Sequence, residues 1–137
     1  MAKQASVIGI DLGTKNSCIG LWKPEDNSVE ILTNEIGETT TPSSIAYTGS
    51  SPEAMQIVVG AKAQLSDNWI YDAKRMIGKA FTDEDVQQHR RKWPFRAVAG
   101  QGGTCEVSIP NLGNFAVAEV SSHVLIHLKK LAEKKVS

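Results

Sequence analysis

Cysteine, net charge and long apolar runs are all scarce in this chain of 137 residues. The two cysteines, Cys18 and Cys105, lie far apart and lack the spacing of metal ligands, so we expect free thiols in a reducing compartment rather than a disulfide. Fifteen basic residues balance fifteen acidic ones, and no run of apolar residues approaches the length of a membrane-spanning helix. The composition therefore predicts no nucleic-acid partner and no membrane partner.

The N-terminus also lacks the features of a targeting segment. Residues 1–6 precede the first strand-like run, which leaves no room for a secretory or transit peptide. We therefore expect a cytoplasmic protein. The length is that of one ordinary domain, and 41% hydrophobic with 22% charged residues is typical of a globular protein that buries a core.

Two strand-like runs near the N-terminus are joined by a turn that is too small and polar to be a packing element. Residues 7–12 and 16–22 each show the period of two that is typical of strands. Gly13 and Asn16 mark the turn between them. Several backbone N–H groups of such a turn can converge on one concavity, which suits a phosphate with the Lys15 ammonium nearby.

Asp11 stands at the end of the first run, where its carboxylate can hold the water shell of a magnesium ion beside that phosphate. The same residues also fit an ordinary hairpin in which Asp11 only favours the turn. The turn has neither the spacing of a Walker loop nor that of GxGxxG. The rest of the chain must decide between these two interpretations.

Further strands and helices follow from the residue pattern. Strands are expected at 29–32, 44–47, 56–59, 96–99, 104–109 and 115–117. Helical segments are expected at 61–68, at 72–78 with Asp72 as N-cap, at 82–91 with Thr82 as N-cap, and from Glu119 onward. Residues 33–42 form a polar loop that is long enough to have a function, and residues 69–71 form an apolar bridge.

Several of these stretches together resemble the N-terminal part of the ATPase domain of Hsp70 chaperones. They are Gly9-Ile10-Asp11-Leu12-Gly13-Thr14 with Asn16-Ser17-Cys18, Asn34-Glu35 with Thr40-Thr41-Pro42-Ser43, Asp72-Ala73-Lys74-Arg75-Met76-Ile77-Gly78, and Lys92-Trp93-Pro94-Phe95. Each is modest alone, but their order and spacing along nearly the whole chain are specific. The resemblance implies a partial actin-like, ribonuclease-H-like α/β fold, the N-terminal portion of lobe I. Residues 1–40 and 117–137 would belong to the base subdomain, and 41–116 to a small upper subdomain.

The resemblance also implies a site for ATP or ADP with magnesium. Gly13, Thr14 and Lys15 match the loop that wraps the phosphates in that family. Asp11 matches the aspartate that helps to organise the metal, here through water. Lys15 itself departs from the family pattern, because a second threonine is usual at this position, and the added cation either tightens phosphate binding or crowds the metal.

Lys74 matches the catalytic lysine that reaches the γ-phosphate and the attacking water. This role suits the chemistry, because an ammonium held over the phosphate offsets charge in the transition state. Arg75 is adjacent and would bind the nucleotide near the same cleft. A second departure from the family is the loop 48–56, which is longer than is typical and is interpreted as a surface insertion.

The implied function is that of an ATP-dependent protein-folding chaperone. Its partners would be unfolded polypeptides, bound through a C-terminal domain, together with J-domain co-chaperones and nucleotide-exchange factors. The family's second phosphate loop and adenosine pocket have no counterpart in residues 1–137, so we expect this segment alone to be inactive. Two alternatives stay open: a non-catalytic module that presents the small subdomain to co-chaperones, and a sugar or acetate kinase of the same superfamily.

Overall fold

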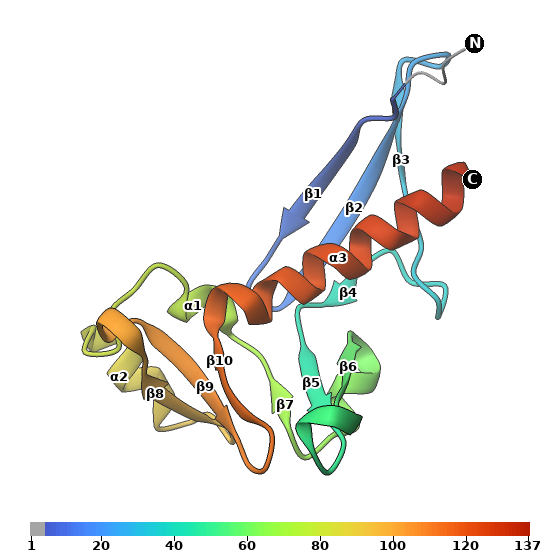
Figure 1. Cartoon of the computed structure of the whole chain (residues 1–137). Helices are drawn as coiled ribbons and strands as arrows, with labels where there is room; N and C mark the ends of the chain where they lie inside the picture. The colour runs from blue at the N-terminus through green and yellow to red at the C-terminus, as the bar shows by residue number, and fades with distance from the viewer. Residues whose placement is uncertain (1–4) are drawn as a thin grey trace.

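The structure is a computed structural model that describes residues 5–137. Residues 1–4, which belong to the stretch on which the prediction of no targeting peptide rests, lie outside the described residues. Within the described part, the architecture is mixed α/β, with antiparallel sheets and one long helix (Figure 1). Among residues 5–137, no helix combines the length and the apolar character needed to span a membrane.

The N-terminal sheet has the order β1-β2-β3, and β4 pairs with the start of β2. Its strands are β1 (Ile8–Leu12), β2 (Asn16–Lys23), β3 (Ser28–Ile31) and β4 (Thr41–Pro42). The register pairs Asp11 with Cys18 across the predicted hairpin, which is confirmed. Ile19 and Leu21 are buried on one face of β2, whereas Trp22 is exposed on the other. This alternation is the one that the sequence predicts.

The helix α3 (Val117–Val136) packs along one face of this sheet (Figure 1). The helical spacing of Val120, Val124 and Leu128 predicts an apolar stripe on this helix, and the burial of all three confirms it. The helix begins before Glu119, because Val117 is 3% exposed and enters the core as the first helical residue rather than as the end of a strand. Ile126, on the far side of the helix, is 46% exposed in this chain.

Two small sheets follow in the middle of the chain. The first has the order β6-β5-β7, with β5 (Ile45–Thr48), β6 (Gln56–Val59) and β7 (Trp69–Ile70); the second has the order β10-β9-β8, with β8 (Arg96–Ala99), β9 (Cys105–Ile109) and β10 (Gly113–Ala116). Short 3₁₀ turns occupy Pro52–Ala54, Ala61–Leu65 and Gln101–Gly103. The apolar bridge is in fact the strand β7, because Ile70 pairs with Ile45 and is 1% exposed.

The short helix α1 (Ala73–Met76) confirms a helical segment after Asp72, but the predicted capping is wrong. Asp72 has a left-handed backbone, with φ +60°, and its side chain makes no capping hydrogen bond. Its carboxylate instead accepts a hydrogen bond from Nε1 of Trp93 at 3.0 Å. The Asp72 carboxylate is therefore engaged in a tertiary hydrogen bond instead of a capping bond to the N-terminus of α1.

The helix α2 (Glu84–Arg90) is also capped differently from the prediction. The N-cap is Asp83 rather than Thr82, and its carboxylate accepts hydrogen bonds from the backbone N–H groups of Asp85 and Val86. A carboxylate accepts these bonds better than a hydroxyl and also favours the positive end of the helix dipole. This explains why the helix begins one residue later than expected.

One cluster of buried apolar residues joins the three sheets and α3. Tyr47 and Phe115, from the two small sheets, stack with ring centroids 4.1 Å apart. Trp93 and Phe95 stack at 5.1 Å and are 8% and 9% exposed. The aromatic residues that follow the basic run at 89–92 predict a core anchor, and the burial of Trp93 and Phe95 confirms this prediction.

Candidate functional site

The turn between β1 and β2 is held at its carbonyl oxygens by residues from elsewhere in the chain. Lys74 Nζ donates a hydrogen bond to the carbonyl oxygen of Leu12 at 2.8 Å. The Ser43 hydroxyl donates to the carbonyl oxygen of Gly13 at 2.8 Å, and the Ser43 backbone N–H donates to that of Lys15 at 2.8 Å. The acceptors of this turn are therefore largely occupied.

The donors of the same turn are largely free. The Gly13 N–H donates to the carbonyl oxygen of Asn16 at 3.1 Å, but the backbone N–H groups of Thr14 and Lys15 have no acceptor within residues 5–137. The turn is too tight for a side chain at Gly13, because a Cβ there would lie 2.3 Å from the carbonyl oxygen of Asn16. Free N–H groups beside occupied carbonyl groups make a local positive field, which suits an anion.

Two recesses adjoin this turn, and Thr14 lines both of them. The smaller recess, of about 20 Å³, is also lined by Gly13 and Lys74, and it has room for about one water molecule. The larger recess, of about 510 Å³, is also lined by Lys15 and Arg75. The structure therefore brings the predicted loop and its cations together, with Lys74 at one recess and Lys15 with Arg75 at the other.

Asp11 is placed differently from the other predicted site residues. It is exposed and lines a groove on the outer face of the sheet, beside Cys18 and Trp22, rather than either recess of the turn. Within residues 5–137 its carboxylate has no ion pair, and no cluster of three or more potential metal ligands occurs. A single free carboxylate suits magnesium, which usually keeps several waters and shares phosphate oxygens, better than it suits zinc.

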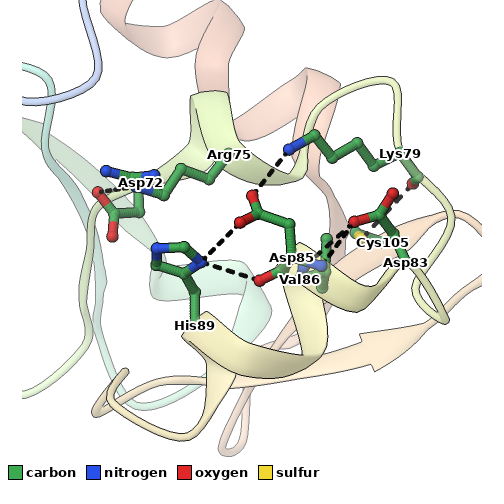
Figure 2. Close-up of polar contacts among 8 residues, drawn as sticks. All are labelled: Asp72, Arg75, Lys79, Asp83, Asp85, Val86, His89 and Cys105. Atoms are coloured by element: carbon green, nitrogen blue, oxygen red, sulfur yellow. Dashed lines mark hydrogen bonds and ion pairs between the residues drawn. The ribbon is translucent and has the colours of Figure 1, made fainter.

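Lys74 reaches the turn because α1 is fixed at both ends. Met76 is 1% exposed and anchors α1 in the core. At the start of α1, the Asp72 carboxylate accepts a hydrogen bond from the Trp93 indole. The same carboxylate lies 3.6 Å from Nε of Arg75 (Figure 2). The buried Trp93 thus orients the residues that flank Lys74, which sequence reasoning assigned only to the core.

A second polar group, between α1 and α2, is structural (Figure 2). Lys79 Nζ lies 3.0 Å from the Asp85 carboxylate, and this hydrogen bond lowers the pKa of Asp85 below its usual value. His89 Nδ1 lies 2.9 Å from the carbonyl oxygen of Asp85. Burial raises the pKa of the Cys105 thiol, which keeps it protonated and unreactive. Cys105 and Cys18 are both free thiols, as expected.

Sequence reasoning missed the role of Ser43 and its neighbour Ser17. The two hydroxyl oxygens lie 2.7 Å apart, and Ser43 holds the turn at Gly13 and Lys15. Ser43 ends the Thr-Thr-Pro-Ser segment on which the family resemblance partly rested. The place of Ser43 in that segment was the signal in the sequence that could have pointed to its role. The contact itself depends on the fold, which pairs the segment with β2 beside the turn.

Comparison with known proteins gives matches along most of the chain. The family model described as Hsp70 protein matches residues 7–137. A ribosome-associated molecular chaperone of Zygosaccharomyces rouxii is 42% identical over 135 residues, which cover 94% of this chain and 21% of that protein. The heat shock cognate HSP70 protein of Trypanosoma brucei brucei is 38% identical over 129 residues, covering 92% of this chain and 19% of that protein. A ribosome-associated molecular chaperone of Saccharomyces cerevisiae is 40% identical over 134 residues, which cover 94% of this chain and 21% of that protein. The chain therefore spans about a fifth of the length of these relatives.

Proposed function

Because the chain belongs to the Hsp70 family, we propose that it is the N-terminal part of an ATP-dependent protein-folding chaperone. In this role it contributes the first phosphate-binding loop and the catalytic lysine for ATP hydrolysis. The complete protein would act on unfolded polypeptides in the cytoplasm through a C-terminal domain, with J-domain co-chaperones and nucleotide-exchange factors as partners. Residues 1–40 with 117–137 form the base subdomain in this proposal, and 41–116 form the small upper subdomain.

One observation carries the proposal: the turn at Gly13 has occupied carbonyl groups and free N–H groups. The unbonded N–H groups of Thr14 and Lys15 can both donate to phosphate oxygens. Hydrogen bonds of this kind are stronger than those between neutral groups, because the acceptor is an anion. Gly13, Thr14, Lys15 and Arg75 are the residues that would hold the phosphates of ATP or ADP.

Lys74 is the residue that we propose for the chemical step. Its ammonium lies at the turn, 2.8 Å from the carbonyl oxygen of Leu12, and is exposed to a ligand placed there. Bound ATP supplies the phosphoanhydride bond that is hydrolysed. An ammonium positioned beside that bond stabilises negative charge in the transition state and orients the attacking water.

Asp11 is the residue that would hold magnesium, through water. Its exposed carboxylate has no hydrogen bond or ion pair within residues 5–137, so its oxygens are available to hydrated metal. Magnesium retains most of its waters and is commonly bound by one or two carboxylates together with phosphate oxygens. A single aspartate at the end of β1 fits that requirement.

We propose that residues 1–137 alone neither bind ATP tightly nor hydrolyse it. Phosphoryl transfer depends on groups that converge on the phosphate from several sides. Residues 5–137 offer one loop, one carboxylate and three cations, and Asp11 lies apart from both recesses of the turn. Turnover by the isolated chain above the rate in buffer would contradict this part of the proposal.

A chimera tests the assignment directly. This chain replaces the matching N-terminal segment of the Saccharomyces cerevisiae chaperone that is 40% identical to it, and ATP turnover is measured with and without Lys74→Ala. Loss of one stabilising donor is expected to lower turnover by about 10²–10³-fold. Lys129→Ala, which removes an exposed lysine on α3, is the matched control and should leave turnover unchanged. Unchanged turnover in the Lys74→Ala chimera would refute the role given to Lys74.

A further inference from the structure

We propose that Ser43 is the positioning residue of the phosphate-binding loop, an inference that rests on the proposed function. Ser43 contacts the turn twice, through its hydroxyl to the carbonyl oxygen of Gly13 and through its N–H to that of Lys15, both at 2.8 Å. These two carbonyl groups lie on either side of Thr14. No other residue of the described chain holds two carbonyl groups of this turn.

Peptide geometry converts these contacts into the direction of a donor. The Gly13 carbonyl and the Thr14 N–H belong to one planar trans peptide, so they point in opposite directions. When Ser43 holds the Gly13 oxygen, the Thr14 N–H must therefore point away from Ser43. The peptide that follows Lys15 is fixed in the same way. Ser43 thus sets the direction of the free N–H group of Thr14 before any ligand arrives.

Ser17 completes a chain of hydroxyl groups. A hydroxyl has one proton, and that of Ser43 is donated to the Gly13 oxygen. In the 2.7 Å contact between the two hydroxyl oxygens, Ser17 must therefore be the donor. Ser17 is 1% exposed and lies on β2, so the chain begins on a rigid, buried strand. Each bond in such a chain strengthens the next.

The backbone around Ser43 is itself firmly held. Ser43 directly follows β4, where Pro42 pairs with Asn16 of β2. The preceding residue of β4, Thr41, is 3% exposed and accepts a hydrogen bond from Nδ2 of Asn34 at 3.2 Å. The polar loop 33–42 therefore delivers a fixed serine to the turn, which gives this loop the function that its length suggested.

The test uses the 137-residue chain, labelled with ¹⁵N, and sodium tripolyphosphate as the anion at constant ionic strength. The amide shifts of Thr14 and Lys15 give the dissociation constant, and hydrogen exchange of the Gly13 N–H reports the order of the turn. Ser43→Ala is expected to weaken binding by about five- to tenfold, the equivalent of one lost hydrogen bond, and to speed exchange at Gly13. Ser43→Thr keeps the hydroxyl and should restore both values.

The matched control is Ser121→Ala. Ser121 lines the same small recess and is 7% exposed, but its hydroxyl makes no hydrogen bond within residues 5–137. Its loss should change neither the dissociation constant nor the exchange rate. Ser17→Ala removes the first donor of the chain, and it should shift both values in the same direction as Ser43→Ala but by less. If Ser43→Ala does not fold, Ser17→Ala tests the positioning role of Ser43 in its place.

The inference is overturned if Ser43→Ala, or Ser17→Ala in its place, stays within about twofold of wild type in affinity and leaves exchange at Gly13 unchanged. It is also overturned if Ser121→Ala has the same effect as Ser43→Ala. Weak binding of tripolyphosphate is what the proposed function expects of residues 1–137 alone, whereas no binding at the highest soluble concentration would overturn the proposed phosphate-binding function. The exchange measurement needs no anion, so it still decides whether Ser43 positions the turn.

Discussion

The ammonium of Lys74 and the carbonyl oxygen of Leu12 lie 2.8 Å apart, although 62 positions separate them in the sequence. This contact brings α1 against the end of β1. It also shows why Lys74 is available to a ligand, because the side chain is exposed and its partner is a neutral backbone group. An anion at the turn would offer the ammonium a stronger acceptor than that carbonyl.

Lys74→Ala should therefore weaken anion binding without unfolding the chain. Because the side chain is exposed, we expect the free energy of unfolding to change by no more than about 0.5 kcal/mol. Affinity for tripolyphosphate should fall by about tenfold. Urea unfolding and an NMR titration give the two values, with Lys129→Ala as control. An equal loss of affinity in both variants would mean that only overall charge matters.

Gly13→Ala should distort the turn, whereas Gly9→Ala should not. A Cβ at Gly13 would lie 2.3 Å from the carbonyl oxygen of Asn16, but a Cβ at Gly9 has nothing within 4 Å. We expect Gly13→Ala to lower the free energy of unfolding by about 1–3 kcal/mol and to abolish the anion-induced shifts. Gly9→Ala, in the adjoining strand, should leave both properties close to wild type. Denaturant unfolding and the same titration measure them, and equal stability of the two variants would contradict the geometry of the turn.

Asp83→Ala should destabilise α2, whereas Thr82→Ala should have little effect. The Asp83 carboxylate accepts two backbone hydrogen bonds at the start of the helix. Its loss is expected to cost about 1 kcal/mol of unfolding free energy. Asp83→Asn keeps a capping oxygen and should recover most of that loss. Thermal unfolding measures the stability of all three variants. A larger loss of stability in Thr82→Ala than in Asp83→Ala would support Thr82 as the N-cap, which is what the sequence pattern predicts.

Glu30 should stabilise the chain at neutral pH and lose this effect in acid. Hydrogen bonds from Lys23 and Lys135 hold the pKa of Glu30 below its ordinary value of 4.5. A lowered pKa in the folded state gives stability that is complete above the unfolded value and disappears as the pH falls through the folded value. The melting temperature of Glu30→Gln should therefore lie below wild type at pH 7, and the difference should vanish well below pH 4.5.

The salt dependence of this effect is its control. Glu30 and its partners are on the surface, and charges there are screened strongly at about 1 M salt. The difference between wild type and Glu30→Gln should shrink in high salt at pH 7. A difference that persists in both acid and high salt would show that the amide substitution acts through packing instead.

Much of the fold could be predicted because its patterns are local. The hairpin follows from alternation of apolar residues, and α3 follows from the spacing of Val120, Val124 and Leu128. The fold class was predicted from the family resemblance, and the family match over residues 7–137 confirms it. The division into subdomains and the roles of the site residues remain predictions that no comparison tests.

The features that could not be predicted depend on contacts distant in sequence. Asp72 was expected to cap α1, but the indole of Trp93, 21 positions later, binds its carboxylate. The strand β4 consists of Thr41 and Pro42, which no periodicity marks and which exist as a strand only because β2 is beside them. The role of Ser43 was missed for the same reason. The residue pattern alone does not place Lys74 beside the turn. That placement was predicted from the family resemblance.

The distance in sequence between Leu12 and Lys74 has a consequence for a chain that is still being synthesised. The hairpin can close in about 1–10 µs once its own residues are available. The turn acquires its lysine only after 62 further residues have been made, which takes about 3–12 s at about 5–20 residues per second. An isolated two-stranded hairpin is only marginally stable in water, so in a nascent chain the turn forms only transiently during this interval, and its contact with Lys74 is made only when α1 has emerged and folded back.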